Sequence, residues 1–188
     1  MTRSESISDA LENAAEGSSN TFSHAKAYVT IPKAKLMNQS DSHNWYLDSG
    51  ATDHICCSRL AFSYYESLPR DREIDVYMGD NSSVKAKGVG NVYLTTIGCE
   101  PGQRSEISLK RVLYVPDFCI NLLCLSALQN FGYDIHAPSR QKHAVITDSY
   151  GNWRSSCIQE QNIYHLKTVN SGSKLRVDKR DRVRTLSA

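Results

Sequence analysis

The sequence predicts a small, mainly β domain with one short helix and a polar segment at each end. Between residues 45 and 166, apolar residues alternate with polar ones in several short runs. Turn residues separate these runs at intervals of roughly eight to twelve residues. One stretch, residues 121–132, changes to a helical period. Short strands at this spacing with one brief helix are typical of a small β-barrel or sandwich.

Bulk composition allows one modest core and excludes two classes of protein. The chain has 188 residues, of which 40% are hydrophobic and 22% charged, and its formal net charge is +2. That balance neither favours nor excludes nucleic acid. No run of about 18 apolar residues is present, so we predict no membrane span. The N-terminus has no apolar signal segment, so we expect a cytoplasmic protein that is not secreted.

The two ends differ in composition from the middle. Residues 1–42 are rich in Ser, Asn, Ala and charge, and we predict a disordered segment with a short helix beginning near Ser8. Residues 167–188 are polar and basic. A solvated, disordered tail is favoured there over a weak nucleic-acid contact. The predicted domain is residues 43–166.

The strand pattern begins with three long runs. "EIDVYMGD" (73–80) alternates and then turns, and "SVKAKGVGNVYLTTIG" (83–98) alternates on both sides of residues 88–90, where glycines allow a bend. "EISLKRVLYVP" (106–116) ends at its proline. In the next stretch Leu122, Leu125 and Leu128 fit a short helix closed by Gly132. Further strands are expected in "YDIHA", "HAVITD" and "NIYHL".

Six cysteines without an export signal indicate free thiols. No CxxC pair is present, and His54 two residues before Cys56 is a poor start for a tetrahedral zinc site. We predict no metal and no cofactor.

The candidate for chemistry is the turn Asp48-Ser49-Gly50, which follows an apolar run. One interpretation is an ordinary turn, because these residue types are common in turns. The other is catalytic: two aspartates that share one proton can activate water for peptide hydrolysis. Glycine would let a backbone amide approach the carboxylate. The pattern occurs once, so a working pair requires a C2 homodimer.

Three motifs carry a resemblance to a known family. "WYLDSGATDHI", "VYMGDNSSVKAKGVGNVYL" and "LKRVLYVPDFCINLLCLSALQNFGYDI" follow one another in this order. Together they resemble the protease segment of a copia-type retrotransposon Pol polyprotein, a retropepsin-like aspartic protease. The resemblance implies a closed β-barrel of the retropepsin-like acid protease type and a homodimer. It also implies a polypeptide substrate, the Gag-Pol precursor, cleaved in the cytoplasm or in virus-like particles.

The resemblance also implies roles for single residues. Asp48 would be the catalytic acid and base. Ser49 and Gly50 would complete the active-site turn, with Ser49 hydrogen-bonded across the dimer, and Ala51 and Thr52 would continue the motif.

Other positions carry further expectations. His54 stands where the family pattern has histidine, and a structural hydrogen bond is favoured over proton transfer. Residues 121–123 would pack under the turn. Cys124 departs from the pattern, since copia-type relatives usually have serine there. The glycine-containing segment is either part of a flap over the cleft or a simple bend; the flap candidates are Gly88, Val89 and Gly90.

Three functions follow from these patterns. The favoured one is an aspartic endopeptidase acting as a homodimer. The alternative is a catalytically inactive Pol fragment whose β-barrel serves structural or interaction roles. A nucleic-acid-binding protein that uses its basic tail is the third.

Overall fold

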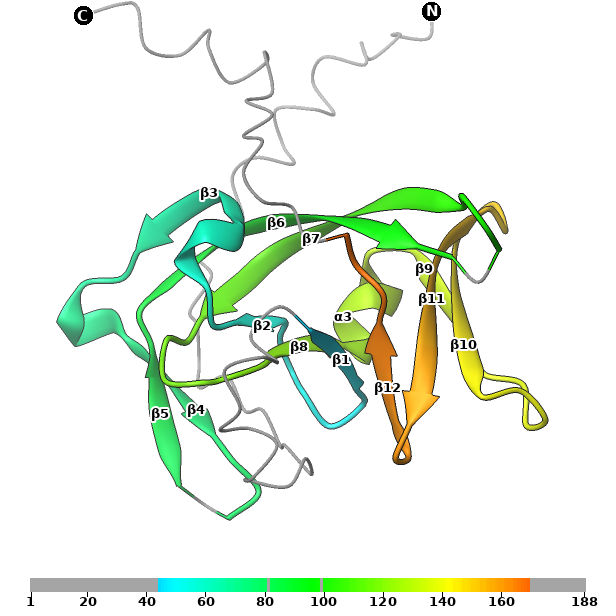
Figure 1. Ribbon diagram of the computed structural model, residues 1–188. Coiled ribbons are helices and arrows are strands. Elements are labelled where there is room, and N and C mark those ends of the chain that lie inside the picture. Colours follow the sequence, from blue (N-terminus) through cyan, green and yellow to red (C-terminus); the bar gives the residue numbers. More distant parts are fainter. Residues whose placement is uncertain (1–43, 81, 99, 170–188) are drawn as a thin grey trace, which may run out of the picture.

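The computed structural model describes residues 44–80, 82–98 and 100–169. The predictions for residues 1–42, and for the tail beyond residue 169, lie outside these ranges. Within them the protein is mainly β with one short α-helix, as predicted (Figure 1). No helix in the described part of the chain is long and apolar enough to cross a membrane.

The elements follow one another in a simple order. The strands are β1 (Trp45–Asp48), β2 (Ile55–Cys56), β3 (Phe62–Ser67), β4 (Ile74–Tyr77), β5 (Ser83–Ala86), β6 (Gly88–Ile97), β7 (Arg104–Tyr114), β8 (Asn121–Cys124), β9 (Tyr133–His136), β10 (His143–Asp148), β11 (Trp153–Glu160) and β12 (Ile163–Leu166). The helix is α3 (Leu125–Asn130), and short 3-10 turns are η2 (Arg59–Ala61) and η3 (Arg70–Arg72).

Ten strands form one sheet in the order β3-β6-β7-β2-β8-β1-β12-β11-β10-β9, and β4 and β5 form a separate hairpin. The expectation of a closed barrel is wrong, because this ladder has two ends, β3 and β9. The sheet is a curled half-barrel instead (Figure 1). Its two halves meet partly through side chains: the Thr96 hydroxyl on β6 donates to the Arg154 carbonyl on β11, at 2.8 Å.

A short pairing crosses the opening of the half-barrel. The amide of Val169 donates to the carbonyl of Thr95, and the amide of Ile97 donates to the carbonyl of Lys167, both at 2.9 Å. An isolated bridge joins Thr96 to Thr168. Residues 167–169, at the start of the predicted tail, therefore lie against β6 without forming a strand.

Strand β8 departs from the predicted pattern. All four of its residues are buried, and it pairs in parallel with β1. Strands buried on both faces read as continuous apolar runs without alternation. The spacing of Leu122 from Leu125 therefore predicted a helix that starts too early. The helix begins at Leu125 and ends before Gly132, whose φ is 83°.

The buried side chains form two clusters that position the strands around β1 and β8. One contains Tyr46 of β1 and Leu122 of β8 together with Val76 of the β4–β5 hairpin. The other contains Trp45 of β1 and Leu123 of β8. Alternate residues of β1 and β8 thus anchor both faces of the same strand pair, which makes its far end a rigid place for a functional turn.

Candidate active site

Asp48 is the last residue of β1, a central strand. Strand β1 pairs in parallel with β8 and in an antiparallel direction with β12, so it is hydrogen-bonded on both sides. In this register Asp48 lies opposite Cys124. The carboxyl group therefore begins from a fixed backbone position, as the catalytic interpretation of the turn requires.

The turn after β1 folds back onto its own carboxylate. The Gly50 amide donates to Oδ1 of Asp48 at 2.8 Å, which is the close approach that glycine permits. Ser49 and Gly50 are exposed, whereas Asp48 is half-buried. Burial raises the pKa of Asp48 above its ordinary value, although the amides of Gly50 and Ala51 act to lower it. The site thus presents, at the surface, a carboxyl group that retains its proton more readily than a solvated aspartate.

The remaining motif residues point in different directions. Ala51 is buried, with 3% of its surface exposed, and belongs to the core. Thr52 is exposed, and its hydroxyl donates to Oδ2 of Asp53 at 3.0 Å. The structure thus brings Asp48, Ser49 and Gly50 together as one turn, while Thr52 interacts with a second carboxylate.

His54 is a buried histidine, with 2% of its surface exposed. Its Nδ1 accepts a hydrogen bond from the backbone amide of Cys124, at 3.0 Å. Burial lowers the pKa of His54 to about 4, so the ring is neutral at neutral pH. The structural hydrogen bond expected for this side chain is present.

Cys124 has a role that the sequence pattern did not reveal. Its thiol donates to the Ala51 carbonyl at 3.0 Å and accepts from the Ala127 amide at 3.3 Å, at the N-terminus of α3. It therefore links the turn after β1 to the beginning of the helix. The sequence carried one signal for this role: cysteine stands where copia-type relatives usually have serine, and a thiol and a hydroxyl can both donate and accept a hydrogen bond.

Asn121 holds the other end of β8. Its Oδ1 accepts from the Cys57 amide at 3.0 Å, and its Nδ2 donates to the Asn44 carbonyl at 3.1 Å. The side chain thereby ties β8 to the residue just after β2 and to the residue just before β1. A packing role under the turn was expected for residues 121–123, and the buried amide adds a polar connection to it.

Gly88, Val89 and Gly90 open strand β6, where they pair with both β3 and β7. In the sheet order β7, β2 and β8 separate β6 from β1, so these residues are not part of the Asp48 turn. A Cβ at Gly90 would lie 2.0 Å from the carbonyl oxygen of Tyr64. This glycine is required by close strand packing.

The β4–β5 hairpin comes immediately before Gly88 and contains most of the first half of the motif VYMGDNSSVKAKGVGNVYL, whose resemblance implies a flap. It is separate from the main sheet and projects to one side of the molecule (Figure 1). Its base is anchored in the core by Ile74, Val76 and Ala86, which are at most 4% exposed. Its turn is closed by the Met78 amide, which donates to the Ser82 carbonyl at 2.8 Å.

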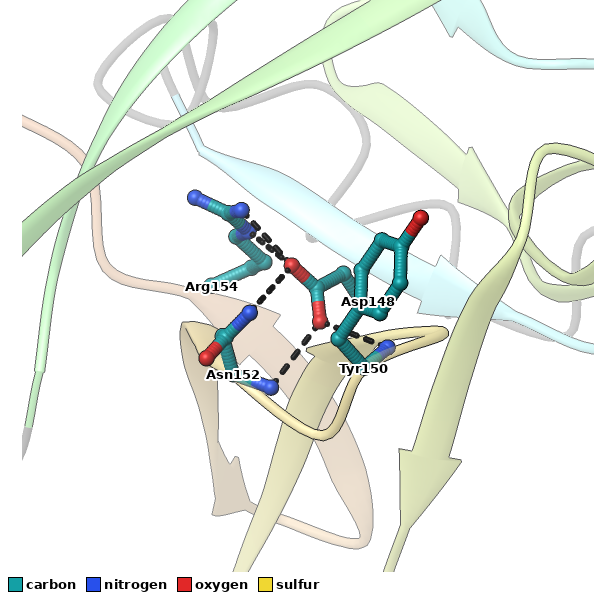
Figure 2. Close-up of polar contacts among 4 residues, drawn as sticks. All are labelled: Asp148, Tyr150, Asn152 and Arg154. Atoms are coloured by element: carbon teal, nitrogen blue, oxygen red, sulfur yellow. Dashed lines mark hydrogen bonds and ion pairs between the residues drawn. The ribbon is translucent and has the colours of Figure 1, made fainter.

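A second aspartate with a shifted pKa has a different environment. Asp148, at the end of β10, accepts hydrogen bonds from the amides of Tyr150 and Asn152, each at 2.9 Å, and pairs with Arg154 of β11 (Figure 2). Donors from Asn152 are the main cause that lowers the pKa of Asp148 to about 2. Its lone pairs are occupied by its own hairpin, which indicates a structural role.

Metal ligands and reactive thiols are not apparent around the turn. In residues 44–80, 82–98 and 100–169, no group of three or more His, Cys, Asp or Glu side chains could hold a metal ion. Burial raises the pKa of Cys56 to about 12 and that of Cys57 to about 11. These thiols therefore stay protonated at neutral pH and are poor nucleophiles.

Comparisons with known proteins point to transposable elements. Residues 45–133 match the family described as Pol polyprotein, beta-barrel domain. The retrovirus-related Pol polyproteins from transposons RE2 and RE1 of Arabidopsis thaliana are each 33% identical over 101 residues, which is 53% of this chain and 6% of each relative. A putative transposon Ty5-1 protein of Saccharomyces cerevisiae is 32% identical over 94 residues, which is 50% of this chain and 51% of that protein.

These relatives set the extent of the likeness. The chain spans about 6% of each plant polyprotein and about half of the yeast protein. No solved structure matches the chain. The matched segment contains β1 to β8, α3 and the Asp48 turn. Residues 45–133 are therefore similar to the Pol polyprotein beta-barrel domain family, and about half of the chain is similar to retrotransposon Pol proteins.

Proposed function

We propose that this domain is an aspartic endopeptidase that acts as a homodimer and cleaves a Gag-Pol type polyprotein. The observation that carries the proposal is the Asp48 turn: a half-buried carboxyl with a raised pKa, held by the Gly50 amide at the end of a central strand. The resemblance of the three sequence motifs to copia-type protease segments supports the same reaction. The expected location is the cytoplasm or virus-like particles.

A second copy of the chain would complete the site. Ser49 and Gly50 are exposed, so the turn of one protomer is accessible to its counterpart in another. A two-fold axis places each residue beside its own twin, so two Asp48 carboxyls would share one proton. The ionised carboxylate would then remove a proton from a water molecule, and this water would attack the peptide carbonyl carbon. The protonated carboxyl would donate to the carbonyl oxygen to form a tetrahedral diol. The proton taken from water would then pass to the amide nitrogen, the C–N bond would break, and the diol would return one hydroxyl proton to the other carboxylate.

The β4–β5 hairpin is proposed as the flap that covers bound polypeptide, with Gly88, Val89 and Gly90 at its base. Strand β5 ends at Ala86, and the chain enters β6 two residues later. A cover whose far end moves while this base stays anchored would admit a substrate and then exclude water.

The test is a cleavage assay with a matched pair of variants. Wild type, Asp48→Asn and Asp134→Asn are incubated with a peptide library between pH 4 and 9, and products are identified by mass spectrometry. Asp134 is an exposed aspartate on β9, so its variant makes the same charge change away from the turn. We expect wild type and Asp134→Asn to make cuts that Asp48→Asn does not make. They should be most frequent at mildly acidic pH, where one carboxyl of the pair holds a proton.

Two results would contradict the proposal. Equal cleavage by Asp48→Asn would show that another group, or a contaminant, is responsible. No cleavage by wild type at concentrations where sedimentation shows dimers would favour the alternative, an inactive domain with a structural or interaction role. Salt-sensitive binding of nucleic acid by the basic tail, measured separately by titration, would support the third function.

A further inference from the structure

We propose that His54 and Cys124 are positioning residues that hold the Asp48 turn in its reactive geometry, an inference that rests on the endopeptidase activity proposed above. Cys124 contacts the turn at two points. Its thiol donates to the Ala51 carbonyl, and its backbone amide donates to Nδ1 of His54, both at 3.0 Å. Cys124 also lies opposite Asp48 in the parallel pairing of β1 and β8. The strand beside the carboxylate therefore fixes the turn that follows it.

The hydrogen-bonding capacity of both side chains is used in a definite way. Nδ1 of His54 accepts a hydrogen bond, so the neutral ring carries its proton on Nε2. The Cys124 thiol has one proton, which is donated to the Ala51 carbonyl. The sulfur accepts from the Ala127 amide, and its 3.1 Å contact with the Ser126 hydroxyl then has serine as donor. This arrangement fits only a neutral imidazole and a protonated thiol.

Ala51 transmits the constraint to the carboxylate through the two peptide groups on either side of its Cα. The Gly50 amide donates to the carboxyl group at 2.8 Å, and the Ala51 amide, like that of Gly50, acts to lower the pKa of Asp48. The Ala51 carbonyl is the group that the Cys124 thiol holds. If this carbonyl were released, the amide donors on Asp48 would shift with it.

The alternative explanation is that His54 and Cys124 only fill space in the core. Both are almost fully buried, at 2% and 0% exposure. Core filling would need only the volume of the two side chains, whereas the observed bonds join positions 51 and 54 of one turn to a single residue of β8. Substitutions that keep the volume or the hydrogen bonds separate these two explanations.

Protonation of His54 gives the inference a pH signature. The cavity beside the ring, about 280 Å³, is lined by Asp53 of the turn and by Lys110 and Arg111 of β7, and Cys124 lies on the Nδ1 side of the ring. Burial lowers the pKa of His54 to about 4. Below this pH an N–H at Nδ1 would face the N–H of Cys124, and the hydrogen bond would be lost. Activity should therefore fall below about pH 4 even where one Asp48 carboxyl is still ionised.

The experiment compares four variants and one control in the full chain. His54→Ala and Cys124→Ala remove the contacts. His54→Asn restores an acceptor near Nδ1, and Cys124→Ser restores a donor and an acceptor. Cys157→Ala is the control, because Cys157 on β11 is equally buried and undergoes the same change. The measurements are kcat and KM for a cleaved peptide, the pH profile of kcat, melting temperature, and the NMR hydrogen-exchange protection of the Gly50 amide.

The expected results separate positioning from packing. Both alanine variants at the site should lower kcat about 10- to 100-fold with little change in KM, because small displacements of a reacting group carry penalties of this order. Cys124→Ser and His54→Asn should recover most of the loss, and His54→Asn should extend activity below about pH 4. Cys157→Ala should destabilise the fold while retaining kcat at temperatures where it is folded. If kcat follows melting temperature alone across all five variants, the inference is wrong.

The Gly50 amide keeps this test independent of the proposed function. If wild type cleaves nothing, the endopeptidase proposal fails, but protection of Gly50 still reports on the turn. The two alanine variants at the site should lose this protection while amides of β6 and β7 keep theirs, and Cys157→Ala should lose none. Unchanged Gly50 protection in both site variants would overturn the inference, whatever the activity of the wild type.

Discussion

Single residues show how one side-chain type acquires opposite pKa shifts in the same protein. Asp48 is half-buried beside the Gly50 and Ala51 amides, and burial, which disfavours the charged form, is the larger effect. Asp148 accepts from the donors of Asn152, Tyr150 and Arg154, and these favour the charged form. The first arrangement suits a group that exchanges a proton, and the second suits one that holds a turn (Figure 2).

Substitution of Asp148 should destabilise the protein in a pH-dependent way. Its pKa is lowered to about 2 from an ordinary value of 3.8, so its contribution is present above about pH 4 and disappears as the pH falls toward 2. Asp148→Asn should therefore melt at a lower temperature than wild type at pH 6, and the difference should narrow below pH 4. Thermal denaturation followed by circular dichroism measures this. A difference independent of pH would mean that the charge is unimportant, and Asp134→Asn is the matched control.

Gly90→Ala should disturb the fold before it disturbs any activity. The added Cβ would lie 2.0 Å from the Tyr64 carbonyl oxygen and 2.8 Å from the Phe62 ring, where the backbone of β3 cannot yield. We expect a loss of at least about 2–3 kcal/mol in the free energy of unfolding, as for overpacked cores. Urea denaturation measures it. Gly102→Asn is the control, because a Cβ there meets nothing within 4 Å and asparagine tolerates its φ of 77°.

Among the elements, the β4–β5 hairpin stands apart, because its two strands form ladder hydrogen bonds with each other and not with the ten-stranded sheet. Its two strands pair with each other and form a sheet of their own, whereas β6 is paired along its length with β7 and partly with β3. An isolated two-stranded ladder is held mainly by its packing. Here Val76, with 0% exposure, supplies that packing at the base, and the far end of the hairpin is more exposed.

Amide hydrogen exchange should therefore be faster in the hairpin than in the main sheet. Peptides covering residues 74–86 should exchange at least about 10-fold faster than peptides from β6 and β7, since local opening needs less free energy where few neighbours are lost. Mass spectrometry of deuterium uptake makes this comparison. Equal protection in both regions would leave the hairpin unsuited to act as a moving cover.

The elements also show which patterns in the sequence could be read. Strands with one face in the core alternate, so β4, β6 and β7 were predictable. All residues of strand β8 are buried and show no alternation, so the spacing of its leucines predicts part of a helix instead. Strand β11 buries Ser155, Ser156 and Cys157 in succession, and strand β3 is mostly exposed, so neither presented a recognisable period.

At the scale of the whole molecule, the important fact is that one chain provides one Asp48 turn. The turn was predictable, because the residue order Asp-Ser-Gly after an apolar strand is visible in the sequence. The hydrogen bonds of Cys124 were not, because they depend on the parallel pairing of residues that are far apart in the chain. The open half-barrel was not predictable either, since sheet closure depends on which edges meet.

Mixing protomers should reveal whether two turns make one site. At fixed total protein, an equal mixture of wild type and Asp48→Asn should have roughly one quarter of the wild-type activity if only dimers with two aspartates work. Independent protomers would retain about one half. A peptide-cleavage rate measured after subunit exchange distinguishes the two values. The same mixture made with Asp134→Asn should keep full activity.

The position of β12 determines when, during synthesis, strand β1 can be paired on both sides. Strand β1, which carries Asp48, has β8 on one side and β12 on the other, and β12 ends only at Leu166. A nascent chain that has emerged as far as residue 133 contains the whole matched segment, yet β1 would still have an open edge with unpaired amides and carbonyls. The residues of the Asp48 turn are thus synthesised early, but the strand that carries them is paired on both sides only after β12 has been synthesised and has folded against it.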